Sequence, residues 1–275
     1  MTRLFELDAY TPSEIADKVE SVGVAKAHLS TLQTLMLGTI AGGFIGLGAL
    51  YYTLVISDAQ LSFAASRVLG GVVFSLGLAL VIVAGAELFT GNNLLVMAWA
   101  DGKVTTRELL RNWVLVYIAN AAGAIGLAGL VYLSHHADMN HGVVGLAYVK
   151  IAAAKTALPF AEAFFKGILC NLLVCLAVWL ALAGHTVTDK ILAIILPISA
   201  FVAAGFEHSI ANMYFIPLGI FLKNDIAASA GVDTTMLDWA HFIGNLVPVT
   251  LGNIFGGSVL VALVYYIIYR RNAHE

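Results

Sequence analysis

The clearest candidate for a chemical role is His208, a histidine inside a long apolar segment. Between Lys190 and Lys223 the chain carries no Asp, Glu, Lys, Arg or His other than Glu207 and His208. An ionisable group at membrane depth is costly to bury and is by default a candidate for a functional role. We therefore expect His208 to handle a proton. The alternative is a structural histidine whose ring is held by hydrogen bonds.

Two glutamates occupy equivalent places in a repeated motif. Residues 85–92 read GAELFTGN and residues 205–212 read GFEHSIAN, so both follow the pattern G-x-E-x-x-x-x-N. Glu87 and Glu207 could relay protons. The alternative, which we favour, is that each carboxylate accepts hydrogen bonds from backbone N–H groups freed by a break in a helix, which keeps it ionised.

Further polar side chains lie in these motifs or beside a neighbouring apolar run. Thr90 can donate its hydroxyl to an anion or to an imidazole, or it can cap the following helix. Asn171, within GILCNLLVCLAVW, can orient His208 or contact a substrate, or it can join two helices through a hydrogen bond. Lys155 and Lys166 precede that run, and either can attract anions or extend toward lipid headgroups.

The composition places these residues in a membrane protein. The chain has 275 residues, of which 60% are hydrophobic and only 11% charged, and its mean hydropathy is +0.89. A soluble domain has roughly half apolar and a quarter charged residues, so the apolar surplus must face lipid. The net charge of -3 provides no basic surface for nucleic acid.

Six strongly apolar regions follow one another along the chain. They cover residues 31–56, 68–100, 109–133, 160–183, 191–222 and 240–269. The second and the fifth are much longer than the ~20 residues that a simple span needs. Both carry glycines and polar residues in their second halves, so we expect a helix, a short break and a half-helix in each. Such a break is tolerated in a membrane only where protein or a water-filled cavity meets it.

The motifs divide the chain into two related halves. Matching residues also recur in the third and sixth regions, namely Asn112, Asn120 and Gly123, and Asn245, Asn253 and Gly256. Each half then holds three spans, and because three is odd, the second half must enter the membrane from the opposite side. We predict an all-α transmembrane domain over residues 29–270, with inverted repeats over residues 29–133 and 160–269. Its functional site is expected where the two broken helices meet.

The segment before the first span has the pattern of a separate helix. Residues 11–14, Thr-Pro-Ser-Glu, supply an N-cap, a proline at the first helical position and a capping-box acid. We expect residues 1–28 to hold an amphipathic helix at the membrane interface. With the N-terminus inside, most lysines and arginines fall on the inner side. We therefore expect a multi-pass protein of the bacterial inner (plasma) membrane with both termini in the cytoplasm.

A stripe of small residues runs along the first span. Gly38, Gly42 and Gly46 lie on one helix face, and such stripes allow helices to approach closely. We expect this stripe to lie at the contact between subunits, with packing inside one protomer as the alternative.

An external loop is expected after the third region. It carries His135, His136, Asp138 and His141. Their spacing matches no usual ligand set, so a solvated loop is favoured over a metal site. We expect neither a metal nor a cofactor in this protein.

Five stretches make the chain similar to the formate/nitrite transporter family over nearly its whole length. They are AELFTGN at 86–92, NWVLVYIANAAG at 112–123, KGILCNLLVCLAVW at 166–179, GFEHSIANM at 205–213 and NLVPVTLGN at 245–253. The resemblance implies an aquaporin-like fold without Asn-Pro-Ala motifs. It also implies a homopentamer with one pore per protomer and two apolar constrictions around a central histidine. Some stretches resemble nitrite-type members and others formate-type members, so the anion stays open.

Carried over residue by residue, the resemblance assigns roles to single positions. The central histidine matches His208, its threonine partner matches Thr90, an asparagine matches Asn171, and a vestibule lysine matches Lys155. The constriction residues match Phe74, Leu78, Leu88, Val174 and Phe201. By composition alone, those five apolar side chains would be assigned to packing.

Together these patterns predict a channel or transporter for small monovalent anions such as formate or nitrite, and not an enzyme. An unpaired ion in a low-dielectric passage costs many kcal/mol, whereas a neutral weak acid costs far less. We expect cationic vestibules to attract the anion and His208 or water to give it a proton before it crosses. The main rival is an aquaporin-like channel for water or small neutral solutes, against which the ionisable His208 argues. A membrane enzyme or metal protein that uses the loop histidines is a weaker rival.

Overall fold

The described part of the chain is built from helices. The computed structural model describes residues 9–271, apart from the side chains of residues 227–230. The first half contains α1 (Pro12–Ala27), α2 (Thr31–Ile56), α3 (Phe63–Phe74), α4 (Leu76–Ala84), the 3-10 turn η1 (Gly91–Leu94), α5 (Leu95–Ala100) and α6 (Thr106–Leu133). The second half contains η2 (His136–Asp138), α7 (Val143–Thr156), α8 (Phe160–Ala183), α9 (Val187–Ala204), α10 (Ser209–Ala230), α11 (Trp239–Ile254), the π-helical η3 (Phe255–Leu263) and α12 (Val264–Tyr269).

Six helical runs among the described residues are long and apolar enough to cross a membrane. They are Thr31–Ile56, Phe63–Ala84, Thr106–Leu133, Phe160–Ala183, Val187–Ala204 and Trp239–Tyr269. The second and the fifth run end in breaks before η1 and α10, as the sequence predicted. Gly85 and Gly205 stand at these breaks with φ of 80° and 77°. Glycine adopts this left-handed conformation without the steric cost that a Cβ atom would impose.

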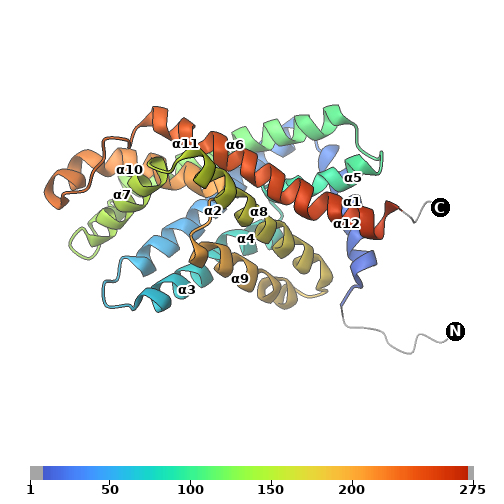
Figure 1. Ribbon diagram of the computed structural model, residues 1–275, viewed down its shortest axis with the longest axis horizontal. Helices are drawn as coiled ribbons and strands as arrows, with labels where there is room; N and C mark the ends of the chain where they lie inside the picture. Colours follow the sequence, from blue (N-terminus) through green and yellow to red (C-terminus); the bar gives the residue numbers. More distant parts are fainter. Residues whose placement is uncertain (1–8, 272–275) are drawn as a thin grey trace.

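The two halves pack with the same internal pattern and opposite direction. In the first half α2 packs against α6 and α1 against α5, while in the second α8 packs against α11 and α7 against α10. Helices α3 and α9 lie side by side between the halves. Figure 1 shows α1, α5 and α12 at one end of the molecule, near both chain ends, and α7 and α10 at the other. We call these the termini face and the α7 face.

Helix α7 was not predicted from the sequence. The histidines do lie in η2 and the adjoining turns, but the chain is helical from Val143 to Thr156. Val144, Tyr148 and Ala152 are fully buried and recur every fourth residue, so they form one apolar face against α10. The helix is too short to span a membrane, and it occupies in the second half the place that α1 has in the first.

Helix α1 rests on the protein at the termini face. Its buried residues Ile15 and Val19 share an apolar cluster with residues of α5 and α8. Glu20, also buried, forms ion pairs with Lys103 at 2.6 Å and with Arg270 at 3.0 Å. The hydrogen bond with Glu20 raises the pKa of Lys103 above its ordinary value. These pairs tie α1 both to the loop before α6 and to the end of α12.

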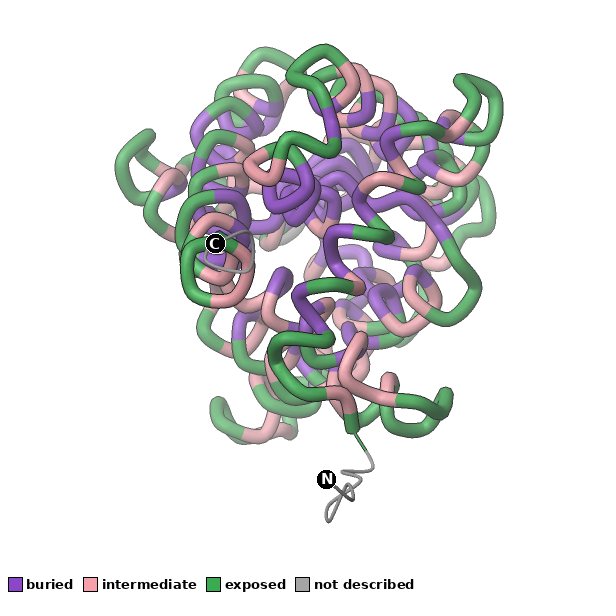
Figure 2. Tube along the Cα trace, turned by 90° about the vertical axis from the view of Figure 1, so that its right-hand side faces the viewer, coloured by how far each residue is buried: buried purple, intermediate pink, exposed green. Residues whose placement is uncertain are grey.

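Buried and exposed residues separate cleanly across the fold. Figure 2 shows exposed positions around the perimeter of the helices and buried positions inside. Many exposed side chains are large and apolar, for example Leu32, Phe63 and Leu196, which are 68%, 83% and 76% exposed. Such a perimeter would be unfavourable in water, so it fits a surface covered by lipid or by other subunits.

The glycine stripe on α2 lies inside the protomer, and its assignment to a subunit contact was wrong. A Cβ atom at Gly38 would lie 2.6 Å from the Cβ of Ala119, and one at Gly42 would lie 2.0 Å from the carbonyl oxygen of Asn120. Both partners belong to α6. The stripe exists because α2 and α6 approach each other too closely for any side chain between them.

This close approach predicts that Gly42→Ala destabilises the folded protomer. The added methyl group would meet the α6 backbone, which cannot rotate away, and overpacking of this kind costs about 1–3 kcal/mol. The matched control is Gly43→Ala on the same helix, because a Cβ atom there meets nothing within 4 Å. Both changes add the same helix propensity, so it cancels. Thermal unfolding of the two variants in detergent would contradict the assignment if their midpoints were equal.

Candidate functional site

The two helix breaks meet at a buried contact between Thr90 and His208. The Thr90 Oγ1 and His208 Nε2 atoms are 3.0 Å apart, and both residues are buried. Thr90 ends the first break, and His208 is the N-cap of α10 after the second. The structure thus joins two positions far apart in the sequence.

Capping by His208 determines which ring nitrogen carries the proton. The backbone N–H of Ala211 donates to His208 Nδ1 at 3.1 Å. Because Nδ1 accepts that bond, the neutral ring carries its proton on Nε2 and donates it to Thr90 Oγ1. This tautomer is assigned from the Ala211 N–H group. The Thr90 hydroxyl hydrogen is then available to another acceptor, whereas protonating Nδ1 would require the cap to break.

An ion pair with a buried carboxylate lies behind the first break. Lys26 Nζ is 2.9 Å from Glu87 Oε1 and donates to Asn92 Oδ1 at 2.8 Å. The side-chain amide of Asn92 donates to Glu87 Oε2 at 2.7 Å and to Asn112 Oδ1 at 2.9 Å. The loop is therefore bound to α1 and to α6 at once.

The second break has the same arrangement. Lys155 Nζ is 2.8 Å from Glu207 Oε1, and Asn212 donates to Glu207 Oε2 at 2.7 Å. Asn212 also donates to Asn245 Oδ1 at 2.7 Å, and the Asn245 amide donates to the carbonyl of Lys155 at 2.8 Å. We call the two sets, Lys26–Glu87–Asn92–Asn112 and Lys155–Glu207–Asn212–Asn245, the Lys–Glu–Asn clamps.

The clamps show what the two glutamates bind. Within residues 9–271 their carboxylates accept from a lysine and an asparagine side chain, and not from the backbone N–H groups that we favoured. Backbone groups at the breaks are bound instead by Asn120 and Asn253. Asn120 accepts from the N–H of Phe89 and donates to the carbonyl of Glu87. In the second half, Asn253 accepts from the N–H of Ser209 and donates to the carbonyl of Glu207.

Asn171 joins the first break to the last span. Its amide group lies 2.7 Å from the carbonyl oxygen of Asn253 and 3.2 Å from that of Thr90. No hydrogen bond to His208 is found among its contacts within the described chain. The geometry supports the interpretation that Asn171 connects helices, and through Thr90 it positions the hydroxyl that faces His208.

Three hollows line up through the protomer on either side of this contact. A vestibule of ≈ 340 Å³ at the α7 face is lined by Lys155, Lys166 and Arg67 among others. A vestibule of ≈ 50 Å³ at the termini face lies under α1 and is lined by Lys26. Between them is a cavity of only ≈ 10 Å³. We call them the Lys155 vestibule, the Lys26 vestibule and the central cavity.

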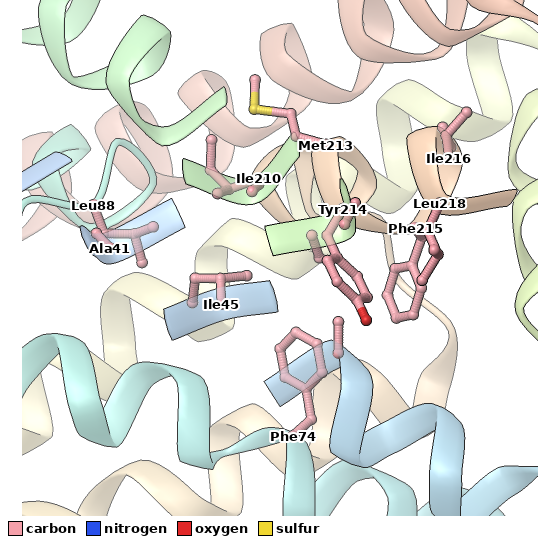
Figure 3. Packing of buried hydrophobic residues seen from close by; sticks show 14 of the residues in the cluster. Ala41, Ile45, Phe74, Leu88, Ile210, Met213, Tyr214, Phe215, Ile216 and Leu218 are labelled. Carbon is pink, nitrogen blue, oxygen red and sulfur yellow. The ribbon is translucent and has the colours of Figure 1, made fainter. Parts of the chain in front are cut away.

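The central cavity brings together the apolar residues that the family resemblance selected. It is lined by Phe74, Leu78, Leu88, Val174 and Phe201, together with His208, Ile45 and Ile198. Phe74, Phe201 and His208 also line the Lys155 vestibule, and Leu78 and Leu88 also line the Lys26 vestibule. In Figure 3, Phe74 points toward Ile45, and Leu88 lies beside Ala41. A solute passing between the vestibules would meet this apolar narrowing on both sides of His208.

Sequence reasoning missed Lys26, Ile45 and Ile198. Lys26 had a detectable signal, because it stands as far before Gly38 as Lys155 stands before Gly167 in the second repeat. The isoleucines had none, since one apolar residue among many is assigned to packing. Lys155 also differs from expectation, because its side chain is 15% exposed and ion-paired rather than a free surface charge.

The buried pair predicts that Lys155→Met destabilises the protein more than the double change Lys155→Met with Glu207→Gln. Removing the lysine alone leaves a buried, uncompensated carboxylate, at a cost of about 3–5 kcal/mol. Neutralising both members removes most of that penalty. Thermal unfolding of wild type, both single variants and the double variant forms the cycle. Additive effects of the two changes would show that the pair does not couple across the break.

Known proteins are similar to this chain over nearly its whole length. Residues 13–267 match the family model described as "Formate/nitrite transporter". The chain is 41% identical over 278 residues to "Formate channel FocA" of Escherichia coli (strain K12), covering 98% of both chains. It is 38% identical to the "Probable formate transporter" of Methanothermobacter thermautotrophicus, covering 94% of this chain and 97% of that one.

Solved structures of similar proteins have the same fold. A "Pentameric formate channel with formate bound" superposes with a TM-score of 0.81 at 39% identity, covering 87% of this chain and 97% of that one. An "FNT family ion channel" superposes with a TM-score of 0.82 at 30% identity, covering 93% and 98%. The protein is a multi-pass membrane protein, and the chain belongs to the formate/nitrite transporter family.

Proposed function

We propose that the protein carries small monovalent anions of weak acids, formate or nitrite first among them, across the membrane. The observation that carries the proposal is the path through the protomer, with a lysine-lined vestibule at each end and the Thr90–His208 contact at an apolar narrowing. The similarity to proteins named formate channels supports the same substrate class. The chain acts as a channel or transporter and performs no covalent chemistry.

The central cavity sets the physical problem for such an anion. An unpaired ion loses its hydration there, whereas the neutral acid loses far less. The Thr90 hydroxyl contacts His208, which lines the central cavity, and its hydrogen stays free because the His208 Nε2–H donates to one lone pair of its oxygen. This hydroxyl can therefore donate to an anion that reaches His208. His208 can give that proton to the anion only from a doubly protonated ring, which requires Nδ1 to release the Ala211 N–H; otherwise the proton comes from vestibule water.

We also propose how the protein is arranged in its membrane. It forms a homopentamer with one path in each protomer, a proposal supported by its similarity to a formate channel that is itself pentameric. The protein lies in a bacterial inner membrane with both termini on the cytoplasmic side. The Lys26 vestibule therefore faces the cytoplasm, and the Lys155 vestibule faces the outside. The ion pair between Asp17 of α1 and Arg270 at the end of α12 supports a common side for both termini.

Uptake into proteoliposomes tests the function directly. Vesicles with the purified protein should take up formate and nitrite, and their uptake is compared with that of hydrosulfide, acetate and lactate. Uptake should increase when the external solution is made acidic. Vesicle shrinkage measures the flux of water and glycerol, and it tests the alternative of a neutral-solute channel. Fast water or glycerol flux without any anion uptake would overturn the proposal.

Replacing His208 by Asn should remove part of the pH dependence of formate uptake. Asparagine also caps helices, so α10 keeps an acceptor for the Ala211 N–H, but unlike histidine it cannot take up a proton. The pH dependence that remains belongs to formate itself. A wild-type pH profile in this variant would show that His208 has no titrating role.

Thr90→Val is the companion variant for the same contact. Valine keeps the branched shape but loses the hydroxyl, so we expect uptake to fall roughly tenfold or more at every pH, from loss of the donor to a charged acceptor. The shape of the pH profile should be retained. Unchanged uptake would show that the anion does not use this hydroxyl.

A further inference from the structure

We propose that Arg67 forms a docking site for planar, monovalent anions with two acceptor oxygens, such as a small carboxylate or nitrite, in the Lys155 vestibule. The proposal deepens the proposed function and rests on it. The proposal rests on a difference in contacts between the cationic side chains that line this vestibule. Among the described residues, Arg67 alone is anchored by a hydrogen bond and also keeps N–H donors that no carboxylate occupies.

Arg67 is held in place from one side of its guanidinium group. It comes from α3, and its Nε donates to the carbonyl of Ala203 at the end of the neighbouring helix α9, at 2.8 Å. A Cβ atom at Gly205 would lie 2.7 Å from Arg67 Nη2, so the glycine leaves the space in which the group lies. The carbonyl end of a helix carries partial negative charge, which favours a cation there.

The two terminal nitrogens of Arg67 have no carboxylate partner within the described residues. Its one hydrogen bond in that part of the chain uses Nε, and it appears in no ion pair. Glu207, which also lines the vestibule, is bound to Lys155 and Asn212. Since Arg67 lines the vestibule and is half-buried, its Nη1 and Nη2 groups are available to a solute there.

The charge of the vestibule depends on this residue. Three Lys or Arg side chains line it, and two of them are neutralised: Lys155 by Glu207 at 2.8 Å and Lys166 by Glu162 at 2.6 Å. Arg67 therefore supplies the uncompensated positive charge. Anions entering from the α7 face are attracted mainly to this group, and the two lysine–glutamate pairs contribute little to the electrostatic field.

The inner end of the path has no equivalent. The Lys26 vestibule is lined by one charged side chain among the described residues, and Lys26 is paired with Glu87. By the offset that aligns Glu87 with Glu207, Arg67 corresponds to Val187, which is 55% exposed. The repeat thus duplicates the clamps but not this arginine, so the two mouths differ in how they bind anions.

The guanidinium group gives the site its chemical preference. Two terminal N–H groups in a plane match the two oxygens of a carboxylate or of nitrite, and such forked pairs are stronger and more directional than a point charge. A lysine at the same place would keep the charge but lose the fork. The site should therefore discriminate by geometry as well as by charge.

Saturation of formate uptake from each face tests the site. For entry from the α7 face, Arg67→Gln should raise the half-saturating formate concentration roughly tenfold at low ionic strength, and Arg67→Lys should raise it about threefold. Entry from the termini face should keep its wild-type half-saturation in both variants. A C-terminal tag, accessible on only one side of the vesicle, sorts the two orientations.

Lys150→Gln is the matched control, because Lys150 is an exposed cation of α7 that does not line the vestibule. It should behave as wild type. Equal half-saturation in Arg67→Gln and wild type would overturn the site, and wild-type behaviour of Arg67→Lys would overturn the forked contact. Changes of equal size from both faces would also overturn it. Absence of formate uptake by the wild type would instead overturn the proposed function, so the two failures are distinguishable.

Discussion

The fold depends on the two Lys–Glu–Asn clamps that close the broken helices. A break in a membrane helix frees backbone N–H and C=O groups and requires polar partners that lipid cannot supply. Each clamp places a buried carboxylate between a lysine and an asparagine, and Asn120 or Asn253 binds the backbone of the same break. Because these contacts reach α1, α6, α7 and α11, the loops are held in place although they lack regular structure.

The pathway arises where the repeat is not symmetric. The clamps recur in both halves, but His208 corresponds to Leu88 and Thr90 to Ile210. One half therefore supplies the imidazole and the other the hydroxyl, and their contact crosses the centre of the molecule at 3.0 Å. Symmetry provides a rigid frame with a vestibule at each end, and the unmatched residues provide the chemistry between them.

Several features could be predicted from the sequence because they are periodic or repeated. The spans, the two breaks and the paired glutamates follow from hydropathy and from the two octapeptides. The glycine stripe was detectable too, but its partner was not, since close approach is the same requirement inside a protomer and between protomers. Helix α7 was missed because its apolar stretch is shorter than a span and its buried face is evident only against α10.

Hydropathy and repetition are enough to establish that the chain spans a membrane in two inverted halves and that each half is broken at a glycine beside a glutamate. Both are properties of local sequence, so they can be recognised without coordinates. Which residues meet is evident only in the folded chain: Lys155 and Lys26 neutralise the glutamates, Ala211 assigns the His208 tautomer, and Arg67 keeps free donors among the described residues. These contacts form only when folding brings side chains from distant segments within hydrogen-bond distance. The separation of two residues in the sequence does not give their distance in the folded chain.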